Sequence, residues 1–157
     1  MDKIEECNDS IILTEIQHKS FITVAEEFGY TIENAPYHSA FIKKEKIEKQ
    51  IIDGGQFFVY KIGDEFIGSI GYIFENDSYV IERLAVIPEY RHKGIGKKLM
   101  EFIENIVRNK NSKSIQLEMI DNNSVLKEWY KEQGYKVIET KDKGIIFKIT
   151  IMKKELQ

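Results

Sequence analysis

The sequence predicts an α/β fold in which one mixed β-sheet of about six to seven strands carries helices on both faces. Strand-like and helix-like segments follow one another in the order β-α-α-β-β-β-α-β-α-β-β. Short polar or glycine-containing turns separate several neighbouring strands, which is typical of antiparallel hairpins joined by crossover helices. A length of 157 residues suits a single domain, 1–157, with a sizeable core.

Capping residues and glycines mark the helices. Ser20 and Ser39 can accept hydrogen bonds from the free N–H groups of a first helical turn, and Gly29 can end a helix in the left-handed conformation. Two helices further along the chain have signals of their own. A continuous apolar stripe after a basic turn marks the first, and a polar segment precedes the second, which Gly134 ends. The expected helices are Phe21–Phe28, Ala40–Ile52, Ile95–Val107 and a last one from Asp121–Ser124 to about Gln133.

Apolar, β-branched and aromatic runs between turn residues mark the strands. Gly63-Asp64 predicts a hairpin turn, and Val80–Val86 leaves neither face clearly polar, as expected of a strand covered on both sides. The last strand, Gly144–Lys153, is expected at an edge where it could pair between subunits of a homodimer. The expected strands are Ile11–Ile16, Phe57–Ile62, Glu65–Glu75, Val80–Val86, Ser114–Ile120, Tyr135–Thr140 and Gly144–Lys153.

Composition excludes several classes of protein. A net charge of −3 argues against general nucleic-acid binding. No apolar run approaches the roughly 20 residues that span a bilayer, and the N-terminus MDKIEEC lacks the apolar stretch of a secretory signal. Cys7 is the only cysteine and no two histidines have metal-ligand spacing, so neither a disulfide framework nor a metal is expected. We therefore expect a cytoplasmic protein.

A basic turn, Arg91-His92-Lys93-Gly94-Ile95-Gly96, joins the strand Val80–Val86 to the long helix. A helix N-terminus disfavours cations and favours anions, so basic residues there indicate a bound anion at their centre. Gly94 and Gly96 let the backbone approach that anion without a Cβ atom in the way. A nucleotide P-loop, G-x-x-x-x-G-K-S/T, is excluded because position 91 is Arg and position 98 is Lys. A dinucleotide fingerprint is excluded because Leu99 occupies the place of its third Gly.

The pattern R-x-x-G-x-G after a strand with L-A-V-x-P-x-Y resembles the acyl-CoA pyrophosphate loop of the GNAT N-acetyltransferase superfamily. The segment N-S-V-L-K-E-W-Y-K-E-Q-G-Y, from Asn123 to Tyr135, resembles that family's second motif, with Leu126 where members have Ala. The likeness extends over about residues 9–153 and implies the GNAT fold. It also implies transfer of an acetyl group from acetyl-CoA to a primary amine of a small molecule or peptide, without a covalent enzyme intermediate.

The resemblance assigns roles to particular residues. The fourth and fifth strands of the family splay apart, so that backbone groups of the fourth can bind the pantetheine arm. Main-chain N–H groups of the basic turn would hold the pyrophosphate, Asn123 would hydrogen-bond the pantetheine, and Tyr130 would protonate the leaving thiolate. The expected CoA-binding residues are Leu84, Ala85, Val86, Arg91, His92, Lys93, Gly94, Ile95, Gly96, Lys97 and Asn123.

The general base has two main candidates. Glu82 is expected on a strand face with Leu84 and Val86, where burial would raise its pKa toward a useful value. Glu118 lies on the neighbouring strand, where some relatives carry a catalytic Glu, and His38 is a weaker third candidate. The loop and helix from Thr31 to Ile52, with the hairpin at 141–144, would shape the acceptor pocket. The alternative is a non-catalytic module that binds or senses acyl-CoA.

Overall fold

The computed structural model describes residues 1–157 and contains one seven-stranded mixed sheet in the order β1-β2-β3-β4-β5-β7-β6. The strands are β1 (Asp2–Glu6), β2 (Gln56–Ile62), β3 (Glu65–Glu75), β4 (Ser78–Val86), β5 (Ser114–Ile120), β6 (Lys136–Lys141) and β7 (Ile149–Glu155). The helices are α1 (Ser10–Phe28), α2 (Lys44–Ile52), α3 (Ile95–Asn109) and α4 (Ser124–Glu132), with 3-10 turns η1 (Ser39–Phe41) and η2 (Pro88–Tyr90). The expected fold class and order of elements are confirmed.

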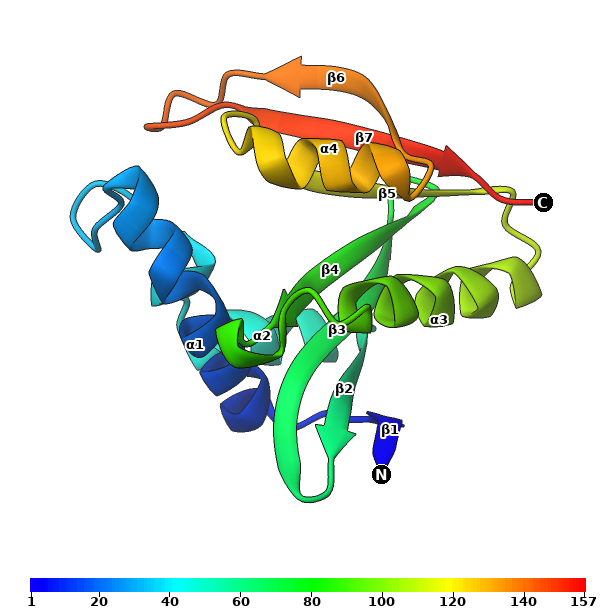
Figure 1. The fold of residues 1–157 in the computed structure, drawn as a ribbon. Helices are drawn as coiled ribbons and strands as arrows, with labels where there is room; N and C mark the ends of the chain where they lie inside the picture. Colours follow the sequence, from blue (N-terminus) through cyan, green and yellow to red (C-terminus); the bar gives the residue numbers. More distant parts are fainter.

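Helices cover both faces of the sheet (Figure 1). On one face, α3 buries Leu99, Ile103 and Val107 completely, in one cluster with residues of β3, β4, β5 and α4. On the other face, Leu13 of α1 and Ile47 of α2 join a second cluster. Each such side chain contributes about 1.5–3 kcal/mol by leaving water. These two clusters hold the sheet between its helical layers.

The first elements differ from the prediction. The strand expected at Ile11–Ile16 is wrong, because these residues form the first turns of α1, which Asp9 caps by accepting from the N–H groups of residues 11 and 12. Leu13, Ile16 and Ser20 are buried at helical spacing, a period that a short apolar run does not reveal. Ser20 is therefore inside a helix and does not cap one. The first strand is instead β1, which pairs with β2. Its charged residues lack the apolar pattern by which a strand is predicted.

Two further elements have other boundaries in the structure than the sequence predicts. The helix expected over Ala40–Ile52 is interrupted, because Ile42 adopts an extended conformation and is buried at 3% exposure between η1 and α2. The edge strand expected at Gly144–Lys153 is also wrong in its start and its place. β7 begins at Ile149 and lies between β5 and β6, so β6 forms that edge of the sheet.

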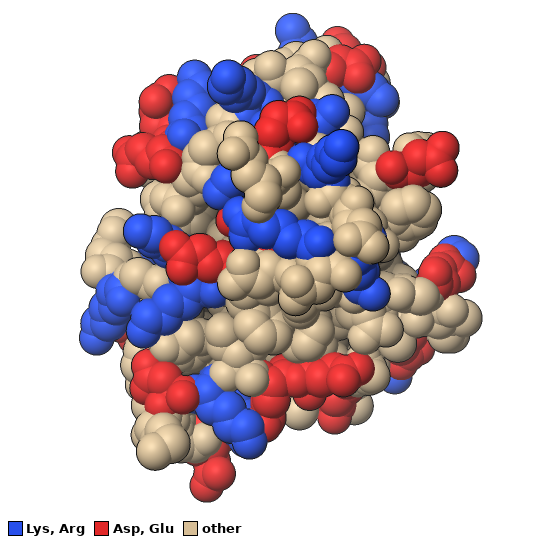
Figure 2. Space-filling model, turned by 90° about the vertical axis from the view of Figure 1, so that its right-hand side faces the viewer, with Lys and Arg blue, Asp and Glu red and all other residues tan.

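Charged residues of both signs are interspersed on the face shown in Figure 2, in keeping with the nearly balanced composition. No helix is both long and apolar enough to cross a membrane. One carboxylate, Glu104 of α3, is buried at 2% exposure, where it accepts a hydrogen bond from the Tyr135 hydroxyl (2.8 Å) and pairs with Lys154 Nζ (3.0 Å). This network ties α3 to the end of β7.

Replacing Lys154 with Met should lower the free energy of unfolding by about 3 kcal/mol, because the Glu104 carboxylate stays buried without its cation. Lys153→Met is the matched control, since Lys153 pairs only with the exposed Glu155 and should change stability by less than about 0.5 kcal/mol. Urea denaturation of both variants measures the difference. Equal stabilities would contradict a structural role for the network.

Candidate active site

The sheet opens between β4 and β5. These parallel strands share one register pair, Val80 with Gln116, and then diverge, whereas β5 stays paired with β7 along its whole length (Figure 1). The expected splaying of the fourth and fifth strands is confirmed. A cleft of about 290 Å³ occupies the opening, with walls from α1, the loop before η1, α4 and the β6–β7 connection. Six of the residues predicted from the sequence line it: His38, Glu82, Leu84, Glu118, Asn123 and Tyr130.

A β-bulge shapes β4 beside the cleft. Gly71 of β3 is paired with Glu82 and Ser69 with Ala85, so Arg83 and Leu84 together oppose a single residue. Arg83 adopts a left-handed conformation, with φ at +56°, which costs a non-glycine residue energy and needs support. Neither bulged residue has a register partner on β5. The backbone of β4 is therefore exposed to the cleft at this point.

Hydrogen bonds from two elements hold the bulge. The hydroxyl of Ser69 donates to the carbonyl oxygen of Arg83 (2.6 Å), and Gln17 Nε2 of α1 donates to the Ser69 hydroxyl (2.8 Å). The Arg83 side chain extends to α2, where Nε donates to Gln50 Oε1 (3.0 Å). Thus the strained residue is fixed from the helical layer that covers it.

The bulge also changes which side chains share a face. Because Gly71 and Ser69 are two residues apart on β3, their partners Glu82 and Ala85 lie on the same face of the sheet. Leu84 and Val86 instead pack against the cluster under α3. The expectation that Glu82 shares a face with Leu84 and Val86 is therefore wrong, since a strand pattern of period two cannot reveal an inserted residue.

Glu82 is a half-buried carboxylate that lines the cleft. Burial raises its pKa, and the negative charges of Glu118 and Glu75 raise it further, whereas Arg83 and Lys46 act in the opposite direction. It forms no ion pair with a neighbouring cation. Such a carboxylate can accept a proton at higher pH than an ordinary Glu.

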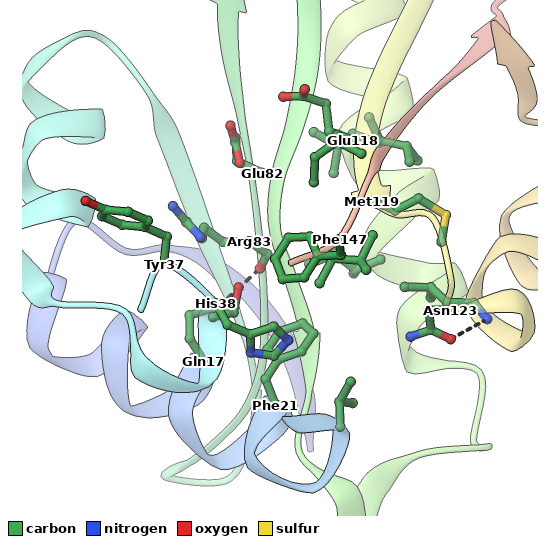
Figure 3. A pocket seen from close by; sticks show the side chains of 18 of the residues that line it. Gln17, Phe21, Tyr37, His38, Glu82, Arg83, Glu118, Met119, Asn123 and Phe147 are labelled. Carbon is green, nitrogen blue, oxygen red and sulfur yellow. Dashed lines mark hydrogen bonds between the residues drawn. The ribbon is translucent and has the colours of Figure 1, made fainter. Parts of the chain in front are cut away.

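Glu118 has a different environment. Its side chain is 46% exposed, and Oε1 lies 3.7 Å from Nζ of Lys143, which comes from the β6–β7 connection and is also half exposed. Figure 3 shows the carboxylates of Glu82 and Glu118 toward the same end of the cleft, with Gln17 and Phe21 toward the other. The two acidic side chains come from the two strands that diverge.

Tyr130 of α4 is buried at 7% exposure, and burial raises the pKa of its hydroxyl. Its ring stacks edge-on against Trp129, with the ring centroids 5.3 Å apart. Asn123 caps α4, because its Oδ1 accepts from the N–H of Leu126 (3.1 Å), which leaves the amide Nδ2 available to the cleft. Both side chains thus border the cleft from α4.

The basic turn before α3 presents unpaired backbone donors. None of the N–H groups from His92 to Lys97 donates to an acceptor in the protein. His92 and Gly94 have positive φ values of 63° and 80°, a conformation that turns successive N–H groups toward a common point and favours anions. Gly96 lies against the Trp129 ring, where an added Cβ atom would be 3.3 Å from it. This contact places the turn beside α4.

Arg91 has a structural role in this turn. Its guanidinium donates to the carbonyl oxygens of Val86 (3.1 Å) and Ser20 and to the Thr23 hydroxyl (3.3 Å). Two of these partners belong to α1. The side chain therefore fixes the turn to α1, while the free donors of the turn are backbone groups.

His38 is buried at 4% exposure, and burial lowers its pKa. Its Nδ1 accepts from the N–H of Ala40 (3.1 Å), so the neutral ring carries its proton on Nε2. Aromatic rings of Phe21, Tyr30 and Phe41 surround it. This histidine caps η1 and belongs to the wall of the cleft.

The sequence did not identify Gln17 or Phe147 as cleft residues, whereas Lys143 belongs to the hairpin 141–144 that was expected to shape the pocket. Gln17 is a polar residue on the buried stripe of α1, a pattern that can indicate a functional residue. The prediction of a strand at Ile11–Ile16 does not include this stripe. Phe147 lies in the connection between β6 and β7, outside that hairpin, and the path of this connection depends on tertiary packing. No local pattern could have placed Phe147 in the cleft.

Comparison with known proteins gives matches in family, sequence and fold. The family model described as the acetyltransferase (GNAT) family matches residues 23–135. A protein of Bacillus subtilis (strain 168), YxbD, is 35% identical over 74 residues, which are 47% of this chain and 45% of YxbD. The chain thus spans about half the length of that relative.

Two solved structures illustrate the likeness in fold. PaiA N-acetyltransferase from Thermoplasma acidophilum, in complex with coenzyme A, matches with a TM-score of 0.79 and 26% identity over 99% of each chain. The ribosomal-protein-S18-alanine N-acetyltransferase from Escherichia coli matches with a TM-score of 0.78. Its 13% identity, over 100% of this chain and 95% of that one, shows a common fold alone.

Glu82→Gln should stabilise the protein increasingly as the pH rises. Burial raises the pKa of Glu82 in the folded protein above its unfolded value of about 4.3. Protonation of Glu82 therefore stabilises the folded protein, and this contribution is fully present at pH values below about 4.3. This stabilising contribution is lost as the pH rises through the pKa of Glu82 in the folded protein. Denaturation at pH 4.5 and 7.5 should show a larger gain for the variant at pH 7.5. A pH-independent difference would contradict the raised pKa.

Proposed function

Because the chain belongs to the acetyltransferase (GNAT) family, we propose that it transfers the acetyl group of acetyl-CoA directly to a primary amine of a small molecule or peptide. One observation carries the proposal: the cleft between β4 and β5 joins exposed strand backbone, two carboxylates and a buried tyrosine beside a turn of unpaired N–H groups. Each of these parts meets one demand of acyl transfer from a thioester.

Acetyl-CoA would bind along the opening of the sheet. The N–H groups from His92 to Lys97 and the positive end of α3 would hold the pyrophosphate, with the exposed side chains of Lys93 and Lys97 adding positive charge. Arg91 would act by fixing this turn to α1. The bound coenzyme A of the PaiA relative supports a donor site of this kind.

The pantetheine arm would continue along β4 toward the bulge. Backbone groups of Leu84, Ala85 and Val86 would pair with its amides, as they would have paired with a neighbouring strand. Asn123 Nδ2 would donate to the arm from the opposite wall. The unpaired backbone at the bulge would then stabilise the oxyanion that forms on the thioester carbonyl.

The reaction itself needs three proton transfers, two from the attacking nitrogen and one to the leaving sulfur. An alkylammonium with a pKa of about 10.4 must lose a proton before its nitrogen can attack the carbonyl carbon. Glu82, acting through a water molecule, would accept that proton, since burial raises the pKa of its carboxyl group and makes it a stronger base than an ordinary Glu. After the attack, the nitrogen carries one proton too many and releases it to water. As the C–S bond breaks, the thiolate of CoA takes a proton from Tyr130, which water then reprotonates. Burial keeps that hydroxyl protonated at neutral pH.

The alternative is a module that binds acyl-CoA without turnover. Incubation with acetyl-CoA and a panel of amines, followed by thiol release, decides between the two. Thiol release that depends on the amine supports transfer, whereas tight CoA binding in calorimetry without release from any amine would support the binding module.

Tyr130→Phe should lower kcat by about 100-fold or more, because general acid catalysis contributes on that scale. The dissociation constant for CoA should stay within about twofold, since the ring and its packing remain. Tyr79→Phe is the control, because that residue lies outside the cleft, in the cluster with Tyr72 and Phe74, and should keep full activity. Unchanged kcat in Tyr130→Phe would remove Tyr130 from the mechanism.

Gly94→Ala should weaken CoA binding by at least about tenfold. The Cβ atom meets no protein atom, but φ at +80° strains any other residue by about 1–2 kcal/mol, and relief of that strain would turn the N–H groups away. Gly63→Ala is a matched control, since Gly63 has φ at +60° and equally open surroundings in the β2–β3 turn. Calorimetry should give the two variants similar stabilities but different CoA affinities. Equal affinities would exclude the turn as the donor site.

A further inference from the structure

We propose that Ser69 of β3 is a positioning residue for the reaction. Its hydroxyl turns the peptide group between Arg83 and Leu84 so that the N–H of Leu84 points into the cleft, and Gln17 of α1 sets the direction of that hydroxyl. Ser69 itself does not line the cleft, so it acts through the backbone of β4. The inference rests on the proposed function and adds the side chains that keep the backbone of the bulge ready for the reaction.

The hydroxyl of Ser69 has a defined direction. It accepts a hydrogen bond from Nε2 of Gln17 (2.8 Å) and donates one to the carbonyl oxygen of Arg83 (2.6 Å). The side chains of Gln17 and Ser69 are completely buried, so water does not compete for these partners. Because a hydroxyl has a single proton, the bond that it accepts from the amide leaves this proton for Arg83. The chain of hydrogen bonds therefore runs one way, from α1 through β3 to the bulge.

The carbonyl oxygen of Arg83 determines where the next N–H points. The protein has no cis peptide bond, and in a planar trans peptide group the C=O and the N–H point in opposite directions. Since the Arg83 carbonyl is directed to Ser69, the N–H of Leu84 is directed away from β3, toward the side from which β5 has diverged. Leu84 lines the cleft on that side. One side chain on β3 thus aims a donor into the cleft through a rigid peptide group.

The bulge needs this support more than the strands around it do. Arg83 has φ at +56°, a left-handed conformation that is unfavourable for a residue with a Cβ atom. On either side of the bulge, Glu82 is paired with Gly71 and Ala85 with Ser69, so the backbone of the sheet holds its register there. Loss of the Ser69 hydroxyl should therefore change the direction of the peptide group and leave the sheet in place.

This direction matters for one step of the proposed reaction. As the nitrogen bonds to the thioester carbon, an electron pair of the C=O bond moves onto the oxygen, which becomes negatively charged. A donor fixed in advance toward that oxygen stabilises the charge where it forms, and a hydrogen bond weakens steeply as its angle falls below about 120°. A misdirected Leu84 N–H should therefore slow the chemical step. Binding of CoA, which would depend on the turn before α3, should change little.

Ser69→Ala tests the inference, with Ser112→Ala as the matched control. The hydroxyl of Ser112 also donates to a backbone carbonyl oxygen, that of Ser114 (2.9 Å), but it lies outside the cleft. Ser69→Ala should lower kcat by about tenfold or more, because loss of a complete oxyanion donor costs about 100-fold or more. The dissociation constant for CoA should stay within about twofold, since the interaction acts in the transition state. Ser112→Ala should keep both values.

Ser69→Thr keeps the hydroxyl and should restore kcat to within about threefold of the wild type, because Thr is suited to a strand. Gln17→Leu should lower kcat alone, and it should add less than about twofold to the loss in Ser69→Ala, because Gln17 acts through Ser69. Unchanged kcat in Ser69→Ala, or equal losses in the folded Ala and Thr variants, would overturn the inference. So would a full additional loss in the double variant.

Amide NMR of the isotope-labelled protein gives a measurement that needs no turnover. In the wild type, the amide resonance of Leu84 should differ between the CoA and acetyl-CoA complexes, because only acetyl-CoA carries the thioester carbonyl. This difference should disappear in Ser69→Ala, and its persistence there or its absence in the wild type would overturn the inference. Absence of thiol release with every amine would instead overturn the proposed function, and the Leu84 resonance would then decide the inference by itself.

Discussion

β4 and β5 separate after a single register pair, and the rest of the structure depends on that separation being maintained. Two adjacent strands with free N–H and C=O groups would ordinarily pair, because unpaired backbone groups are costly to bury. Here the bulge at Arg83 removes the register that pairing needs, and side chains from α4 and the β6–β7 connection fill part of the opening. The sheet is thus kept open by its own irregularity, and the backbone groups that lost their partners become available to a ligand.

α1 connects the two halves of the candidate site. Near its middle, Gln17 supports the bulge through Ser69. Within the next two turns, the carbonyl oxygen of Ser20 and the hydroxyl of Thr23 accept hydrogen bonds from the guanidinium of Arg91. The same helix therefore sets the position of the strand backbone and of the turn before α3. A ligand bound along the opening would contact both parts, whose spacing follows from the rise of one helix. This arrangement explains why Arg91 serves the site through its contacts with protein atoms.

Much of the fold could be predicted because its strongest signals are local. The stripe of α3, the hairpin at Gly63 and the unbroken apolar character of β4 each reflect a period or a turn that a short segment contains. The same holds for the turn before α3, whose glycines and basic residues are contiguous. The failures have the opposite cause. α1 was missed because its apolar start is too short to distinguish a helix from a strand, and the bulge because one inserted residue leaves no mark on composition.

Two of the segments that line the cleft form no hydrogen bond with the bulge at Arg83. Tyr37 precedes η1, and Phe147 belongs to the connection between β6 and β7, while the bulge depends on β3 and α1. Substitutions in those two connections can therefore accumulate without loosening the framework beneath them. Under the proposed function, remodelling of these two surface segments would change which amine is accepted, while the part of the cleft that would bind the acetyl donor stays as it is.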